Sequence, residues 1–199
     1  MKRTHLILGA SIATMTLTAC GHKADANASD NAAAMSSAGL NDSNEAAPPP
    51  IDENSQAAAL SPDQAFANKA AASDAFEIAT SKLALAKADK PALKKFAQQM
   101  ITAHTASTAK LKTATGGLSP AITPDPALSA DQQQTLTDLQ SKSGADFDAA
   151  YKAAQVDGHE KTLDVLKAYA NSGDVPALKT FASSLVPTVT AHLNMAKGL

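Results

Sequence analysis

Four residues whose side chains can coordinate a metal ion or hold a proton stand at mid-helix positions among apolar residues. They are Glu77, His104, His159 and His192. Around His104, steps of three and four residues lead to apolar neighbours: Leu93, Phe96, Ala97, Met100 and Leu111. Around His192 the same steps give Leu178, Phe181, Leu185, Val189, Ala196 and Leu199. Each of the four long helical segments is therefore expected to turn one ionisable group toward the core.

Two interpretations account for these inward residues. In the first, they form a polar network that fixes helix register, with Glu77 and His104 as partners, because an unpaired buried carboxylate becomes neutral. In the second, they bind a metal ion or another small ligand, because imidazole and carboxylate groups suit Zn, Fe, Mn or Cu. We favour the polar network, which does not require a cofactor. Binding of a metal ion or another small ligand is the alternative.

The spacing from the connecting turns places the four residues at similar depth. Glu77 precedes Lys90 by nearly the same number of positions as His104 follows it, so the two should be level. His159 stands closer to Gly173 than His192 does, by five positions along the chain. This difference predicts an offset of about 7 Å, from a rise of roughly 1.5 Å per residue.

Capping residues and prolines mark the helices that must position these groups. Ser61 and Ser129 each precede a glutamine by three residues, the capping-box pattern, and Pro91 and Pro176 each follow a short turn. With the apolar spacing, these signals predict long helices over 62–88, 91–114, 145–170 and 176–197 and a short one over 130–142. Residues 116–126 are rich in glycine and proline and should form a loop.

The chain also contains an internal repeat. Residues 89–97 and 174–182 are identical at seven of nine positions, which reflects either two related hairpins or convergence on a good helix start. Two hairpins joined by a long connection are typical of ferritin-like bundles. No alternating strand pattern appears. We therefore predict an all-α domain over residues 61–199, a ferritin-like up-down four-helix bundle with a short extra helix in the long central connection.

The N-terminus has the pattern of an export signal. Two basic residues precede an apolar stretch of about 14 residues, which is shorter than a membrane-spanning helix, so residues 1–19 are predicted to be a signal peptide. The run Leu-Thr-Ala-Cys ending at Cys20 resembles a bacterial lipobox, which implies lipidation of Cys20. The other interpretation is an ordinary signal cut after Ala19. Because Gly21 follows the cysteine, the resemblance implies an outer-membrane lipoprotein on the periplasmic side of the cell envelope.

Residues 20–60 are expected to form a disordered acidic tether. They contain no aromatic residue and too few large apolar ones to offset the entropy of ordering. The formal net charge of −2 divides into +2 on residues 1–19, −5 on residues 20–60 and +1 on residues 61–199. A near-neutral domain lacks the basic surface that nucleic acids require. The expected partner is the membrane, through the lipid, and no protein partner is indicated.

Three segments of the domain resemble the bacterial domain-of-unknown-function family 4142. They are Phe96–Met100 leading to His104, Ser143–Tyr151 leading to His159, and Leu178–Ala182 leading to His192. The resemblance covers essentially all of residues 61–199. It implies an exported ferritin-like bundle, often labelled a predicted outer-membrane protein, with inward positions at Glu77, His104, His159 and His192. The family implies no reaction, and its common aspartate before the second-helix histidine is Ala103 here.

The sequence contains no recognisable catalytic motif. Ferritin-like di-iron proteins carry Glu-x-x-His pairs, but Ile101 and Val189 stand three residues before His104 and His192 and cannot ligate. A phosphate-binding glycine loop, a His-Glu-x-x-His motif and a Gly-x-Ser-x-Gly elbow are also absent. We therefore expect a lipid-anchored, non-enzymatic envelope protein, with periplasmic metal or small-ligand binding as the alternative.

Overall fold

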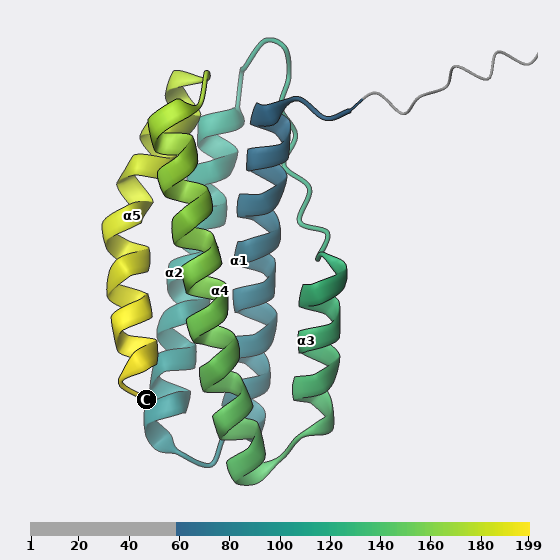
Figure 1. The fold of residues 1–199 in the computed structure, drawn as a ribbon, viewed down its shortest axis with the longest axis vertical. Coiled ribbons are helices and arrows are strands. Elements are labelled where there is room, and N and C mark those ends of the chain that lie inside the picture. The colour runs from purple at the N-terminus through teal and green to yellow at the C-terminus, as the bar shows by residue number, and fades with distance from the viewer. Residues whose placement is uncertain (1–58) are drawn as a thin grey trace, which may run out of the picture. The chain divides into compact units, whose positions relative to one another are not determined.

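A computed structural model describes residues 59–199, which fold into helices without a strand in that range. The helices are α1 (Pro62–Lys87), α2 (Pro91–Thr115), α3 (Ala130–Ser141), α4 (Gly144–Ser172) and α5 (Pro176–Lys197) (Figure 1). The predicted all-α bundle is confirmed, and the helix bounds differ from the predicted ones by at most two residues. The predicted signal peptide, Cys20 and nearly all of the tether lie outside the described residues.

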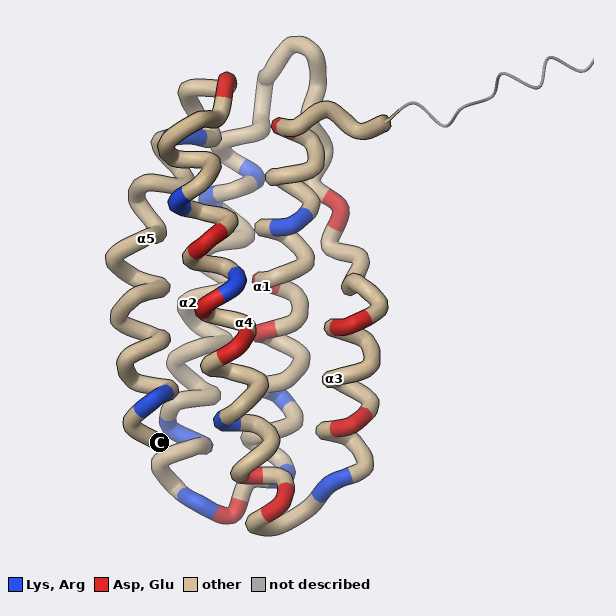
Figure 2. The backbone as a smooth tube through the Cα atoms, in the orientation of Figure 1, with Lys and Arg blue, Asp and Glu red and all other residues tan. Residues whose placement is uncertain are grey.

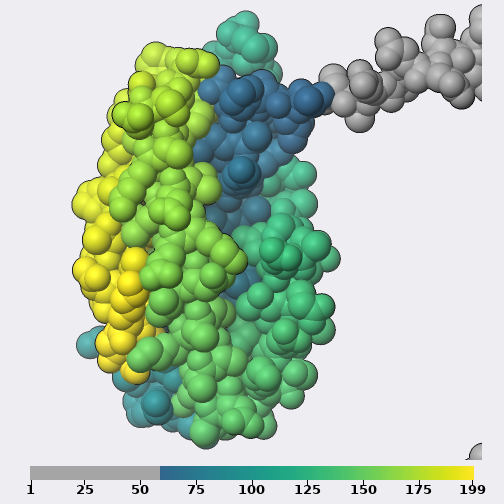
Figure 3. Space-filling view, in the orientation of Figure 1, coloured from purple at the N-terminus to yellow at the C-terminus, as the bar shows by residue number. Residues whose placement is uncertain are grey.

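The four long helices form two antiparallel hairpins, α1–α2 and α4–α5 (Figure 1). The connection from α2 returns along the bundle through α3, so α2 and α4 run in the same direction. Each long helix contacts two others, in the order α1, α2, α5, α4 around the bundle. Figure 3 shows α3 lying against the outside of α1 and α4, which it also contacts. This single crossover matches the predicted short extra helix in the central connection.

Two helix starts have the serine caps that the sequence indicates, but the predicted capping box is complete only at Ser129, because the Gln64 side chain bonds to the backbone of Thr123. The Ser61 hydroxyl accepts from the backbone N–H of Gln64 at 3.1 Å, and Ser129 makes both halves of a capping box with Gln132. These bonds satisfy N–H groups that a helix leaves free in its first turn. At the start of α4, Gly144 adopts a φ of 57°, a left-handed conformation that side chains disfavour.

Apolar side chains fill both ends of the bundle and leave a polar layer in the middle. One cluster gathers around Phe66, Tyr169 and Leu178, where α1 and α5 begin and α4 ends. The other gathers around Phe96 and Phe147, at the opposite end. Between them lie buried polar residues of all four long helices: Asp74, Glu77, Thr80, Ser81, His104, Ser107, Gln155, His159 and His192. The apolar ends therefore hold the helices in a register that presents these groups to one another.

Charged residues are mixed on the outer faces of the bundle. Figure 2 shows acidic and basic positions interspersed along α4. The exposed pair Lys161–Asp157 on α4 and the pair Lys197–Glu160 between α5 and α4 each have 2.8 Å between nitrogen and oxygen. Exposed ion pairs of this kind contribute roughly 0–1 kcal/mol. Among residues 59–199, none of the helices is apolar over a stretch that would cross a bilayer.

A buried carboxylate closes the α1–α2 turn. Asp148, on α4, accepts hydrogen bonds from the backbone N–H groups of Asp89 at 3.0 Å and Lys90 at 3.2 Å. It is one of the residues in the Ser143–Tyr151 segment. The segment at the start of α4 therefore supplies the hydrogen-bond acceptor for the α1–α2 turn.

We expect Asp148→Ala to lower the free energy of unfolding by about 2–3 kcal/mol, because two turn N–H groups lose a charged acceptor. Urea unfolding followed by circular dichroism measures this loss. Asp146→Ala is the matched control, since Asp146 is exposed on the same helix, and it should cost less than about 1 kcal/mol. Equal losses in the two variants would contradict the role given to Asp148.

Candidate metal centre

Three histidines from three helices meet in the polar layer. His104 of α2, His159 of α4 and His192 of α5 have ring centroids 5.6–5.8 Å apart. One nitrogen from each ring lies within 4.8 Å of the other two, and all three residues are buried. Three imidazoles bound to one ion at about 2.0–2.1 Å would have nitrogens about 3.5 Å apart, so closure needs ring movements on the order of 1 Å.

The predicted height offset between His159 and His192 does not keep these rings apart. Residues 173–175 lie outside both helices, so the count should start from the helix ends, Ser172 and Pro176. Counted in this way, His192 lies only three positions farther from its helix end than His159 does. With a rise of roughly 1.5 Å per residue the offset becomes about 4.5 Å, which imidazole side chains can span.

Each of the three rings has one buried nitrogen without a hydrogen-bond partner. His104 Nε2, His159 Nε2 and His192 Nδ1 are buried, and none bonds to any group of residues 59–199. A buried polar atom without a partner costs about 1–3 kcal/mol. The polar layer thus contains three histidine rings that each keep one buried nitrogen unpaired by the described residues.

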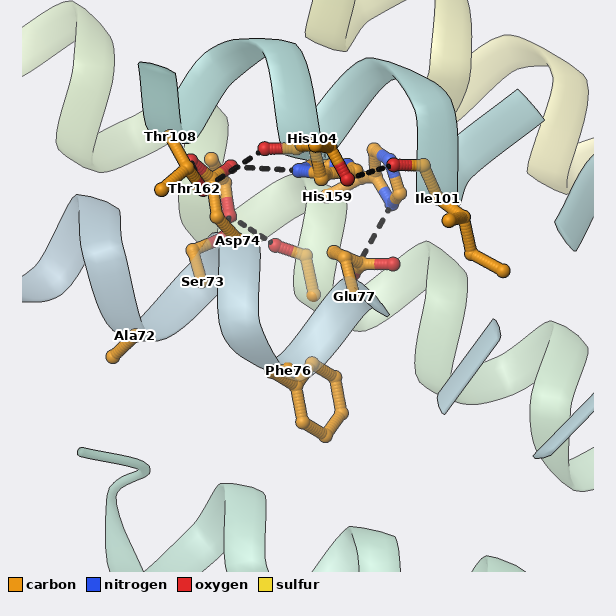
Figure 4. Close-up of polar contacts among 12 residues, drawn as sticks. Ala72, Ser73, Asp74, Phe76, Glu77, Ile101, His104, Thr108, His159 and Thr162 are labelled. Carbon is orange, nitrogen blue, oxygen red and sulfur yellow. Dashed lines mark hydrogen bonds and ion pairs between the residues drawn. The ribbon is translucent and has the colours of Figure 1, made fainter. Parts of the chain in front are cut away.

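The outward nitrogens of two rings are held by the protein. His104 Nδ1 lies 2.8 Å from Asp74 Oδ1, and Asp74 Oδ2 accepts from the Thr108 hydroxyl at 3.1 Å (Figure 4). His159 Nδ1 donates to the backbone carbonyl of Gln155 at 2.7 Å. Such bonds fix the tautomer and the ring orientation of metal-binding histidines. When a ring is neutral and its proton is on Nδ1, Nε2 carries a lone pair. Nε2 of His104 and Nε2 of His159 are then able to bind a metal ion.

The structure pairs His104 with Asp74 and not with Glu77, which corrects the predicted partnership. Glu77 Oε1 lies 3.6 Å from His159 Nδ1, beyond hydrogen-bond distance, and Figure 4 shows the carboxylate against that ring. The expectation of one inward ionisable group per long helix is also wrong for α1. Asp74 and Glu77 are one turn apart on the same face, and both are buried. Glu77 stays outside the group of three nitrogens.

The environment keeps two of the histidines neutral. Burial lowers the pKa of His159 to about 4, and burial with the nearby His104 lowers the pKa of His192 to about 4. Burial also opposes charge on His104, but the hydrogen bond to Asp74 and the charges of Glu77 and Asp74 outweigh it and raise the His104 pKa. At pH 7 His159 and His192 are therefore unprotonated and free to ligate.

Comparison with known proteins identifies the family. The model of the DUF4142 family, described as a domain of unknown function, matches residues 48–199. The chain belongs to this family. No curated protein sequence matches it.

Two solved structures resemble the DUF4142 domain in fold. CopM in the Cu(II)-bound form matches with a TM-score of 0.57 and 18% identity, over 68% of this chain and 93% of CopM. CopM in the Cu(I)-bound form matches with a TM-score of 0.57 and 19% identity, over 70% of this chain and 95% of CopM. At this identity the likeness concerns the arrangement of helices.

A cavity reaches the three-histidine centre of the DUF4142 domain. Its volume is about 450 Å³, and both His104 and His192 line it. Its lining includes apolar residues of α1, α4 and α5 and exposed polar residues near α3. The centre is thus buried in the bundle but connected to open space.

A glycine makes room for the carboxylate beside His159. A Cβ atom at Gly158 would lie 2.8 Å from Glu77 Oε1, closer than carbon and oxygen can approach. The next contact, Phe76 Cε1 at 3.6 Å, is an ordinary one. Gly158 therefore lets the buried Glu77 pack directly against α4.

We expect Gly158→Ala to destabilise the DUF4142 domain, although alanine favours a helix by about 1 kcal/mol over glycine. In a Glu77→Ala background the Glu77 carboxylate no longer occupies this space. Gly158→Ala should then stabilise the DUF4142 domain by about 1 kcal/mol. Denaturant unfolding of the four proteins in this cycle measures the reversal of sign. The same sign in both backgrounds would show that Glu77 does not occupy the space beside Gly158.

Proposed function

We propose that the chain binds one transition metal ion, copper(II) most tightly, through His104, His159 and His192. The observation that carries this proposal is the convergence of three buried histidine rings, each of which has a buried nitrogen without a hydrogen-bond partner. Two of the rings are oriented from behind by Asp74 and by the Gln155 carbonyl, as in metal sites.

A purely structural polar network fits these contacts less well. A network that fixes register satisfies its own donors and acceptors, because unsatisfied buried groups are costly. Here the outward nitrogens of His104 and His159 are satisfied, whereas the inward nitrogens are not. A positive ion at the centre would satisfy the lone pairs of all three rings at once.

Copper is the favoured ion for two reasons. Imidazole ligands suit copper, zinc, nickel and iron, and among divalent ions copper(II) binds nitrogen sites most tightly. CopM, which has a similar arrangement of helices, has structures in Cu(II)-bound and Cu(I)-bound forms. We infer a role in holding metal, and we assign no reaction to the chain.

Copper titration against a competing chelator tests the proposal on the full chain without a purification tag. A His22→Ala background removes the one other histidine that follows Cys20. We expect one tightly bound copper(II) per chain, and a loss of affinity of at least about 100-fold in each of His104→Ala, His159→Ala and His192→Ala. Unchanged binding when all three are replaced would refute the proposal.

We also propose that the chain is a lipoprotein of the cell envelope, anchored through Cys20 on the periplasmic side of the outer membrane. The support is the Leu-Thr-Ala-Cys run after a short apolar stretch with two basic residues before it. Several acyl chains, at about 0.8 kcal/mol per buried CH₂, anchor a protein stably.

Cys20→Ser is expected to move the protein from the membrane fraction to the soluble fraction, because no acyl chain can be attached to serine by this route. Fractionation followed by immunoblotting measures the distribution. Ser55→Ala, a change in the same segment away from the lipobox, is the control. Undiminished membrane association of Cys20→Ser would refute the lipid anchor.

A further inference from the structure

We propose that a metal ion held by the three histidines keeps one coordination position open, and that a small monodentate ligand reaches this position through the cavity. The ligand class is that of azide or imidazole: a small anion or a neutral nitrogen donor that displaces water without electron transfer. This inference rests on the proposed metal binding and adds an exchangeable ligand to it.

The number of protein ligands leaves the position open. Within residues 59–199, no carboxylate or thiol joins the three histidines in a common metal-binding group. Asp74 is engaged by His104 and Thr108, and Glu77 lies on the Nδ1 side of His159, away from the centre. Catalytic zinc sites with three protein ligands hold water or substrate in the fourth position, whereas structural zinc sites close it with a fourth protein ligand, and we expect a copper(II) ion on three histidines to behave as the catalytic sites do.

The cavity provides the route to this position. Two of the three ligating residues, His104 and His192, form part of its wall. Val189 lines it one turn before His192, and Phe181 and Leu185 line it farther along α5. The exposed residues at its edge include Lys69, Asp131, Asp157 and Lys161. A volume of about 450 Å³ far exceeds the roughly 30 Å³ that one water occupies in the liquid, so a small ligand fits.

Ser107 offers a way to narrow this route without touching the ligands. It lies on α2 one turn after His104, it is buried, and it lines the cavity. Within residues 59–199 the Ser107 side chain makes no hydrogen bond, so a substitution there breaks none. Ser107→Leu adds bulk beside the centre, and Ser107→Ala is the matched control that does not.

Azide titration of the copper(II)-loaded full chain, in the His22→Ala background, tests the inference. We expect a saturable azide-to-copper absorption band with the copper content unchanged after gel filtration. Ser107→Ala should keep the rate of azide binding, and Ser107→Leu should slow it at least 10-fold in stopped-flow absorption measurements while still holding copper. Should Ser107→Leu fail to fold, Ser107→Val replaces it, with a smaller decrease of the azide binding rate expected.

The outcomes separate this inference from the proposed function. A chain that holds no copper would overturn the metal proposal itself. A chain that holds copper but shows no azide band would overturn only the open position. An azide binding rate that is equal in the parent and in the narrowed variant would overturn the cavity as the route.

Discussion

Copper at 100 times its dissociation constant is expected to raise the melting temperature of the chain by roughly 10 °C. Binding to the folded state alone adds about 2.7 kcal/mol at this concentration. A domain of this size shifts by about 3–4 °C per kcal/mol. Without metal, the three unpaired ring nitrogens lower the free energy of unfolding of the chain. A bound ion would remove this cost.

The variants make this prediction specific to the centre. At the same copper concentration the shift should fall to about 2 °C or less in His104→Ala, His159→Ala and His192→Ala, because a site weakened 100-fold is at most half occupied. Comparing the shift within each variant cancels the effect of the substitution on packing. Asp157→Ala, which removes an exposed carboxylate near His159, should keep the full shift. A shift that persists in the histidine variants would place the bound metal elsewhere in the chain.

Copper affinity is expected to fall with decreasing pH in a Glu77→Gln variant, with a slope that approaches one proton as the pH drops below the His104 pKa. A metal competes only with protons that the free ligands carry. Burial disfavours charge on His104, but its hydrogen bond to Asp74 still raises the His104 pKa after the charge of Glu77 is removed. His159 and His192, with pKa values of about 4, carry no proton above pH 5. Affinity should therefore fall about 10-fold per pH unit below the His104 pKa and more steeply below pH 4.

The parent chain should have a steeper slope than Glu77→Gln. Burial raises the pKa of Glu77 to about 7, against the opposing effect of a charged His104, so the carboxyl group is protonated below pH 7. A nearby metal cation favours the carboxylate and releases that proton, which brings the slope toward two. Isothermal titration calorimetry in buffers of different ionisation enthalpy counts the released protons. A slope approaching three in Glu77→Gln would mean that the three imidazoles have ordinary pKa values.

The helices follow from local rules that the sequence displays. Serine caps, prolines in the first turn and apolar spacing act within a few residues, so α1 and α3 could be predicted to within a residue at their starts. The inward direction of His104 and His192 follows from the same spacing, since both share a stripe with buried apolar residues. These features need no knowledge of how the helices meet.

The ligand geometry needs the tertiary arrangement. Asp74 is a small acid that most often faces solvent, and its partners His104 and Thr108 both lie on another helix. The signal that could have found it is its position one turn before Glu77 on the same face of α1. The approach of His159 to His192 depends on where α4 ends and α5 begins, which turn residues 173–175 determine. Helix ends are the boundaries that sequence patterns fix least well.

X-ray absorption spectroscopy of the copper-loaded full chain, in the His22→Ala background, tests the central claim most directly. The fine structure of the absorption edge reports how many imidazole rings bind the ion and at what distance. We predict three imidazoles at about 2.0 Å, and two in His192→Ala. A spectrum with one imidazole or none, or one that the histidine variants leave unchanged, would contradict the three-histidine centre.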